Sequence, residues 1–388
     1  MTADPASSSA SDAASRAAAR PEAPSPAAAP VAGPVFLICS ERSGSNLVSA
    51  MLGAHPAIHA HPPHHLGRDL LLNLAQTLPE GTASPAWDHL RRHACAAFAR
   101  YAAPEDAAAF ARDLDALSGP IDPVALARRV WTDLPAAARG RIPLVKENGV
   151  HHLIGFIVSA FPDARFIFQV RDPRDFLASA KARGGRILGN KFGSLRNALA
   201  VWREDQLGGL RALALLGPGR VRLHRYEDLV ADPVGVLGGI CGFLGLAFDP
   251  AMLSFNETDR ARQLAVSGGP RENLARPLMT DNFGRYRATL SRRDIRTTEA
   301  FLGDLMTRFG YPLDYPYAPK PGAWASLRPQ RLELWERLAN GETRPFYKSG
   351  SPKLHLALAA SARSLLPPLS YGADSRGAGG TPAAQETP

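Results

Sequence analysis

Short apolar runs, each followed by a polar turn and then by a helical pattern, recur along the middle of the chain. After the first run, for example, a Gly-containing turn leads into a helix-like stretch at 45–53. Continuous apolar runs are typical of strands that are buried on both faces of a sheet. We expect three such strands and one shorter candidate, at 35–39, 165–170, 221–224 and 144–145.

Strands separated by helices predict a parallel sheet with right-handed crossovers. In such sheets, ligands bind beyond the carboxyl ends of the strands. The loops at 40–46, 171–175 and 225–228 are therefore expected to converge on one edge. Residues 67–140 are rich in Ala, Leu and Arg and are helical in pattern over 67–135, which predicts a helical insertion covering that edge.

The two ends of the chain differ from its middle. Residues 1–33 contain 13 Ala, 6 Ser and 5 Pro, and residues 372–388 hold no large apolar side chain. Neither segment can bury enough surface to offset its ordering entropy, so both are expected to be disordered tails. The folded domain is expected over 34–318, followed by a C-terminal helical extension over 319–371. Two helical patterns lie in that extension, at 328–341 and 352–366.

Composition narrows the class of protein. With 45% hydrophobic residues the chain can bury a sizeable core, but no apolar run reaches the roughly 18 residues of a transmembrane helix. Cys39, Cys95 and Cys241 are odd in number and far apart, which favours a reducing, cytoplasmic location over a disulfide framework. The net charge of +9 suits an anionic ligand through electrostatic steering, whereas the lack of a basic block argues against nucleic acid.

The loop after the first strand reads Ser-Glu-Arg-Ser-Gly-Ser-Asn over 40–46. A small, Gly-containing turn that leads into a helix offers backbone N–H groups and a positive dipole end, which together hold an anion. Arg42 adds a charge. It is not a Walker A loop, because GxxxxGK[ST] is absent. An ordinary strand–helix turn is the alternative interpretation.

Two further loops carry candidate chemistry. In the second, Asp172 can cap a helix that starts at Pro173, with Arg171 at the strand end and Ser179 two turns along the helix. Arg171 and Ser179 together could hold a phosphate; the alternative is a surface salt-bridged turn. In the third, Tyr226 follows a strand and could contact a base or simply pack in the core.

Taken together and in this order, these segments resemble the PAPS-dependent sulfotransferase family, in the branch with an RSGS-type 5′-phosphosulfate loop. The resemblance covers about 34–315. It implies a three-layer, P-loop-like α/β fold with a central parallel sheet flanked by helices. The segments that carry it are VFLICSERSGSNLVSAMLGAHPAI, FPDARFIFQVRDPRDFLASA, HRYEDLVADP with FLGL, and FGRYRATLS with MTRFGYPL.

The resemblance implies a role for each matching residue. The 3′-phosphate is expected at Arg171 and Ser179, adenine at Tyr226, and a closing basic group at Arg276, where the alignment is loose. Lys146, one of only six lysines, matches a residue that contacts the transferred group; a surface Lys paired with Glu147 is the alternative. The 5′-phosphosulfate is expected at Arg42, Ser43, Gly44, Ser45 and Asn46, with Arg42 also offsetting charge during transfer.

The general base is where the sequence departs from the family. Relatives carry Glu just beyond an HP dipeptide, but here that position falls at Pro62-Pro63. Five of the eleven histidines lie within 55–65, and His can serve as a base. We favour His65 and place His64 second. A zinc site is a less favoured alternative, formed by His61, His64, His151 and His152.

The expected activity is sulfuryl transfer from PAPS, as co-substrate, to a hydroxyl or amine, with no metal required. An inactive PAPS- or PAP-binding module is the main alternative, because the acidic base is missing. A P-loop-like kinase is less favoured. The acceptor class stays open among saccharide, lipid, peptide and small metabolite, and the 67–140 insertion is expected to shape its pocket.

Overall fold

The centre of the molecule is a five-stranded parallel sheet in the order β2-β3-β1-β4-β5. The computed structural model describes residues 31–62, 65–67, 81–135, 138–182, 195–266 and 269–316. The strands are β1 (Val35–Cys39), β2 (Ile58–Ala60), β3 (Ile142–Lys146), β4 (Arg165–Val170) and β5 (Val221–Arg225). All four predicted strands are confirmed. The short β2, in the His-rich segment, was not predicted.

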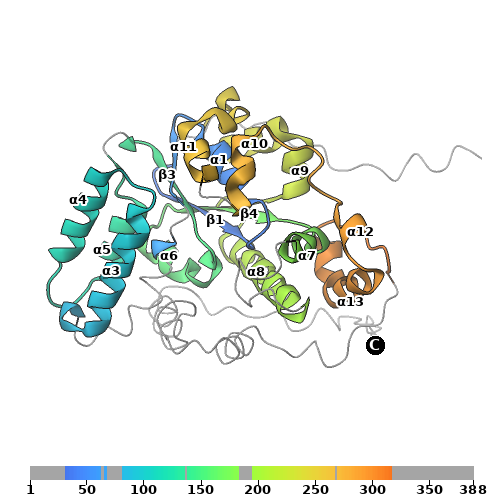
Figure 1. Cartoon of the computed structure of the whole chain (residues 1–388), viewed down its shortest axis with the longest axis horizontal. Coiled ribbons are helices and arrows are strands. Elements are labelled where there is room, and N and C mark those ends of the chain that lie inside the picture. The colour runs from blue at the N-terminus through green and yellow to red at the C-terminus, as the bar shows by residue number, and fades with distance from the viewer. Residues whose placement is uncertain are drawn as a thin grey trace, which may run out of the picture.

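Helices cover both faces of this sheet, giving the expected three-layer α/β fold (Figure 1). Helices α1, α10 and α11 lie on one face, and α6 and α8 on the other. Their bounds are α1 (Ser45–Gly53), α6 (Ile154–Ala160), α7 (Pro173–Lys181), α8 (Leu195–Leu216), α9 (Tyr226–Ala231), α10 (Pro233–Phe243), α11 (Asp259–Val266), α12 (Tyr286–Thr289) and α13 (Arg292–Arg308).

Strand alternation divides the core between the two faces. On β1, Phe36 and Ile38 join the cluster under α6 and α8, whereas Val35 and Leu37 join the cluster under α1 and α10. All four side chains are almost fully buried. Each such burial contributes about 1.5–3 kcal/mol, so β1, at the centre of the sheet, is a rigid platform for the loop that follows it.

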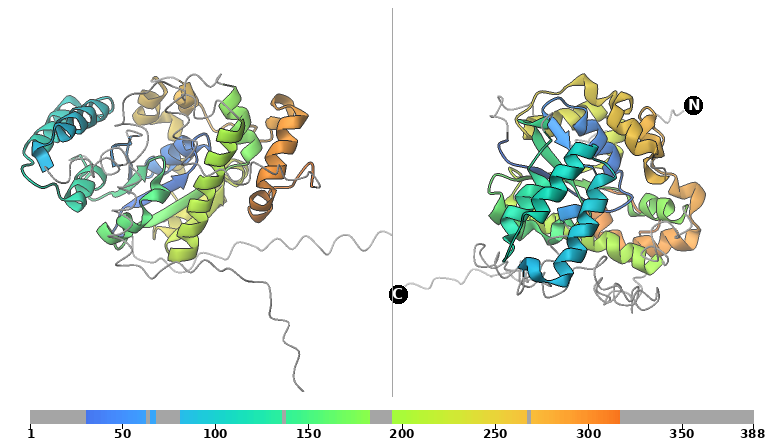
Figure 2. Two further views of the ribbon diagram at one scale, coloured as in Figure 1. Left: turned by 90° about the horizontal axis from the view of Figure 1, so that it is seen from below. Right: turned by 60° about the vertical axis from the view of Figure 1, so that its left-hand side comes forward.

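The described part of the predicted insertion forms three helices, α3 (Pro85–Ala99), α4 (Pro104–Asp115) and α5 (Pro123–Trp131). They lie to one side of the sheet, as Figures 1 and 2 show. Trp131 fixes them to the sheet, because its ring meets that of Phe36 edge-on with the ring centroids 5.0 Å apart. No residue of these three helices lines either of the two cavities described below.

Several predictions fall on residues outside the described part of the chain. They are most of the 1–33 tail, the helical patterns at 328–341 and 352–366, and the 372–388 tail. Within the described ranges, no helix is long and apolar enough to cross a bilayer.

Candidate active site

The loop after β1 is fixed by buried hydrogen bonds from the strand and helix behind it. The Ser43 hydroxyl donates to the Ser40 carbonyl at 2.6 Å, and Gln206 on α8 donates to the Ser40 hydroxyl at 2.7 Å. Gln169 on β4 donates to the Ser43 carbonyl at 2.7 Å. Three buried groups therefore set the loop conformation, and its next residues open α1.

His224 on β5 extends this support by one further residue. Its Nε2 lies 3.0 Å from the Gln169 amide oxygen, which can only accept, so Nε2 carries the proton. Nδ1 is buried and no residue that the structure describes forms a hydrogen bond with it. Burial, helped by the charge of Arg222, lowers the pKa of His224 to about 4. The imidazole is thus neutral at pH 7, and it orients the Gln169 amide that holds the loop.

Arg171 links the first loop to the second. Its Nη1 donates to the Arg42 carbonyl at 3.0 Å and its Nη2 to the Asn282 carbonyl at 2.9 Å. The guanidinium carbon stands 4.5 Å from the centre of the Tyr226 ring, in cation–π contact. Its Nε is also buried and has no hydrogen-bond partner among the described residues. A buried guanidinium with a donor nitrogen that no described residue uses is suited to an anionic ligand.

Arg42 and Ser179 meet across the loop. The Arg42 guanidinium donates to the Ser179 hydroxyl from Nε at 3.1 Å and from Nη2 at 2.8 Å. Arg42 also has a positive φ of 65°, which is uncommon for a side-chain-bearing residue and is found at functional turns. Both side chains line the cavity described below.

Tyr226 closes the third side, at the exit of β5. Its ring packs directly on Gly44, where an added Cβ would lie 2.3 Å from a ring carbon. Its hydroxyl accepts a hydrogen bond from the Asn282 side chain at 2.9 Å. Tyr226 is thus a buried packing residue that also lines the cavity, and its contact with a base stays a prediction.

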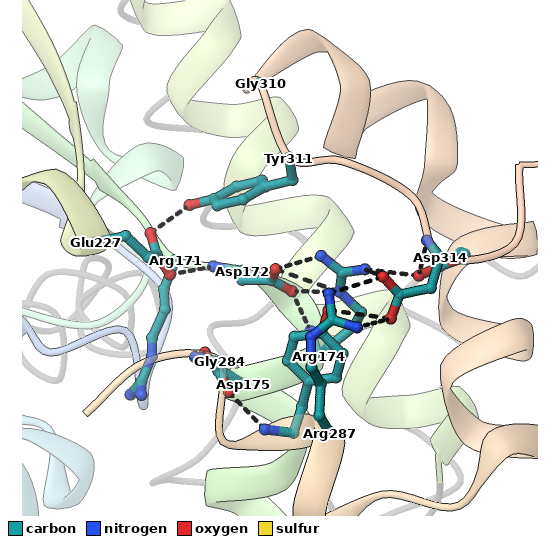
Figure 3. A network of polar contacts seen from close by, with 12 residues as sticks. Arg171, Asp172, Arg174, Asp175, Glu227, Gly284, Arg287, Gly310, Tyr311 and Asp314 are labelled. Carbon is teal, nitrogen blue, oxygen red and sulfur yellow. Dashed lines mark hydrogen bonds and ion pairs between the residues drawn. The ribbon is translucent and has the colours of Figure 1, made fainter. Parts of the chain in front are cut away.

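The start of α7 is held by the ion network of Figure 3. Asp172 caps the helix, as predicted, by accepting from the Arg174 N–H at 2.8 Å, and Pro173 opens it. The Arg174 guanidinium pairs with Asp172 at 2.7 Å and with Glu299 on α13 at 2.6 Å. Burial alone would lower the pKa of Arg174, but these carboxylates raise it overall. This buried network fixes the turn that carries Arg171.

The three loops surround one cavity of about 310 Å³. The sequence pattern pointed to seven of its lining residues, namely Arg42, Gly44, Ser45, Asn46, Arg171, Ser179 and Tyr226. Ser43 is buried behind the loop, and Arg276 is exposed and does not line the cavity. The segment after η8 (Gly269–Ala275) supplies lining residues that sequence reasoning missed, among them Asn282 and Arg285. In the sequence, Asn282 lies just before the segment FGRYRATLS and Arg285 lies within it, and this position was the only indication of a role for either residue.

A second, smaller cavity of about 50 Å³ adjoins the first, because Asn46 lines both. Lys146, at the end of β3, lines the small cavity and is buried, with only 7% of its surface exposed. It is therefore not the solvated Lys of the alternative interpretation. Glu147 points elsewhere in the described structure and accepts from Gly67 N–H and the Trp131 indole.

Of the two histidines predicted as the general base, the structure describes His65 but not His64. His65 has a positive φ of 56°, and its Nδ1 accepts from the Asn148 N–H at 3.2 Å, so the neutral ring carries its proton on Nε2. His61, weighed only as a zinc ligand, lines the small cavity, and its Nε2 donates to the Trp131 carbonyl at 2.9 Å. No cluster of metal-ligating side chains is found among the described residues.

Comparison with known proteins agrees with this geometry. The profile of the sulfotransferase family matches residues 34–250, more than half of the chain. The chain belongs to the sulfotransferase family. The nodulation protein NoeE of Sinorhizobium fredii is 26% identical over 309 residues, which cover 74% of this chain and 68% of that protein. Protein-tyrosine sulfotransferase of Drosophila melanogaster is 24% identical over 47% of this chain and 38% of that protein.

Solved structures give the same fold. The sulfotransferase domain of the Synechococcus PCC 7002 olefin synthase superposes with a TM-score of 0.52 at 25% identity, covering 72% of this chain and 95% of that domain. The sulfotransferase domain of the curacin biosynthetic pathway superposes with a TM-score of 0.50 at 21% identity, over 72% of this chain and 98% of that domain. The fold is thus the P-loop-like sulfotransferase fold, and the chain is a transferase by family.

Proposed function

We propose that this protein transfers a sulfuryl group from PAPS to a hydroxyl or amine of an acceptor. The observation that carries the proposal is the 310 Å³ cavity, which the loops after three parallel strands enclose. A cavity with Arg42 at one loop and Arg171 at another suits a ligand that bears anionic groups at two separate positions.

The bound orientation of the donor follows from these charges. The 5′-phosphosulfate is proposed to lie on the loop at 42–46, where the start of α1 presents backbone N–H groups. The 3′-phosphate is proposed to lie at Arg171 and Ser179, and the unused buried Nε of Arg171 supports this assignment. Tyr226, which lines the same cavity, is proposed to contact the adenine.

In the proposed reaction, an acceptor oxygen or nitrogen forms a bond to sulfur while the bond from sulfur to the bridging phosphate oxygen breaks. Adenosine 3′,5′-bisphosphate (PAP) leaves as an anion, and the acceptor proton passes to a base. Positioning and charge neutralisation supply most of the catalysis in such in-line transfers. Arg42 and Lys146 are proposed to neutralise charge on the bridging and transferred oxygens. Because the leaving group is already a stable anion, the proposal requires no metal.

We propose that a histidine from 59–65 accepts the proton. His65 can do so at Nδ1 if acceptor binding displaces its hydrogen bond to Asn148. We add His61 as a further candidate, because it lines the small cavity together with Lys146 and Asn46. His64 stays a prediction from the sequence.

Donor recognition is tested by comparing two nucleotides that differ only in the 3′-phosphate, namely PAP and AMP. Wild-type protein is expected to bind PAP more tightly by about 10- to 100-fold, the effect of one or two charged hydrogen bonds. Arg171→Gln should abolish most of this preference, whereas Arg211→Gln, an exposed arginine on α8, should retain it. Equal affinity of the wild type for both nucleotides would refute the 3′-phosphate site.

Transfer itself is tested with ³⁵S-labelled PAPS and a broad acceptor panel. His65→Gln is expected to reduce kcat by about 10²–10⁴-fold at unchanged PAP affinity. If His61→Gln has that effect and His65→Gln does not, the base is His61. PAP binding without transfer to any acceptor favours the inactive module, and ATP turnover without PAP binding favours a kinase.

The acceptor is not assigned by the relatives. The two relatives described above are named a nodulation protein and a protein-tyrosine sulfotransferase. The chain spans about two thirds of the length of the first and less than half of the length of the second. Saccharide, lipid, peptide and small-metabolite acceptors therefore stay open in the proposal. A reducing, cytoplasmic location stays a prediction; all three cysteines are free thiols, which supports it.

A further inference from the structure

The small cavity next to the donor site is lined by a half-buried cation, Arg260, that the proposed donor does not use. Its volume of about 50 Å³ accommodates a few water-sized groups, so it fits one carboxylate or sulfate group but not a sugar ring. Arg260, in the first turn of α11, lines it together with Lys146 and Asn46. Arg260 does not line the 310 Å³ cavity.

Arg260 lies in surroundings that disfavour a cation unless an anion joins it. Its Nη2 is buried and has no hydrogen-bond partner within the described ranges. Burial alone lowers the pKa of Arg260 to about 10, with no carboxylate acting against it in the described structure. The start of a helix is also the positive end of its dipole, where a cation is unfavourable. By contrast, the exposed Arg262 of the same helix pairs with Asp259 at 3.4 Å.

The other groups around Arg260 do not neutralise it. No residue that lines the small cavity is an Asp or Glu. The imidazole of His59, on the neighbouring β2, is affected by the Arg260 charge. Burial, then Arg260 and Arg141, lower the pKa of His59 to about 4, so it is neutral at pH 7. Arg260 thus makes the cavity electropositive, and a half-buried guanidinium with no carboxylate beside it in the described part of the chain is stabilised when an anion pairs with it.

We propose that the small cavity binds an anionic group of the sulfuryl acceptor, a carboxylate, sulfate or phosphate, with the Arg260 guanidinium as its counter-ion. The acceptor would then be an acidic molecule. This inference rests on the proposed function, because it takes the large cavity to hold PAPS. Asn46, which lines both cavities, connects the anion site to the loop that presents the sulfuryl group.

Inorganic sulfate is the probe, and the protein is first saturated with PAPS so that the donor's own anions are in place. PAPS and PAP affinities are measured beforehand for each protein. Equilibrium dialysis with ³⁵S-sulfate should then show one sulfate bound per wild-type chain. Arg260→Gln should weaken sulfate by about 10- to 100-fold, and the control Arg262→Gln should not. Circular dichroism confirms that the variants fold.

The outcomes separate the two proposals. If PAPS does not bind to the wild type, the proposed function fails. If PAPS binds but sulfate does not at up to about 50 mM, or sulfate binds equally well to Arg260→Gln, the acceptor-anion site alone is refuted. If Arg260→Gln weakens PAPS relative to PAP, Arg260 holds the donor's sulfonate, and the inference about the acceptor is also overturned.

Discussion

Replacement of Gly44 by Ala tests the contact on which the proposed donor site depends. Gly44 has φ of +87°, and an added Cβ would lie 2.3 and 2.4 Å from two carbons of the Tyr226 ring. Carbon atoms normally approach to about 3.5–4.0 Å, so the ring or the loop must move by more than about 1 Å. Tyr226 would then lose its fit between the loop, Arg171 and Asn282.

The expected loss of stability is the sum of two effects. A left-handed backbone at a residue with a Cβ costs about 1–2 kcal/mol, and overpacking in a filled site costs about 1–3 kcal/mol. Gly44→Ala should therefore lower the free energy of unfolding by about 2–5 kcal/mol. Gly217→Ala is the matched control, because Gly217 has φ of +74° with nothing within 4 Å of the added Cβ. The free energy of unfolding of Gly217→Ala should therefore fall only by the cost of a left-handed backbone at a residue with a Cβ.

Urea denaturation measures the difference between the two variants, and calorimetric titration measures PAP binding. Gly44→Ala should weaken PAP, whereas Gly217→Ala should leave its affinity unchanged. In a Tyr226→Ala background the extra cost of Gly44→Ala should disappear, since the ring is gone. If Gly44→Ala and Gly217→Ala destabilise equally in the wild-type background, the close packing of Tyr226 on the loop is refuted.

Two further predictions concern the residues behind the loops. Arg174→Met should destabilise the protein by about 3–5 kcal/mol in urea denaturation, because Asp172 and Glu299 are left as buried carboxylates. Lys181→Met, which breaks an exposed ion pair, should cost about 0–1 kcal/mol; a cost for Arg174→Met no larger than this contradicts the network. His224 has a lower pKa in the folded state, about 4 against 6.5, so unfolding takes up a proton between these values. His224 should therefore contribute about 3 kcal/mol to the rise in stability as pH increases from 4 to 6.5, and this part is lost on acidification; an equal rise in His224→Gln would disprove this origin.

The sequence contained enough information for the parallel sheet and for the loops at its edge. β1 is a continuous apolar run and β4 has an apolar centre at 166–168, and a buried strand leaves that signal irrespective of its neighbours. The turn at Asp172 and Pro173 was also predictable, because capping depends only on adjacent residues. Proximity of Arg171, Ser179 and Tyr226 then followed from the parallel topology.

What the sequence did not disclose depends on long-range packing. β2 has only three residues and includes His59, so its strand character comes from pairing with β3 and not from its own pattern. Asn282 and Arg285 come from an irregular segment that no periodicity marks. Arg260 looked like any surface arginine of an Arg-rich chain, and only the folded structure shows that its Nη2 is buried.

The buried hydrogen bonds behind the loop at 40–46 affect how tightly a ligand can bind there. Hydrogen bonds connect His224 on β5 to Gln169 on β4, and Gln169 to Ser43 in the loop. The loop therefore loses conformational entropy already when the protein folds. A ligand that binds at this loop therefore spends less of its binding energy on ordering the loop. Substitutions at residues far from the cavity, such as His224, can for this reason change ligand affinity although the substituted residue does not contact the ligand.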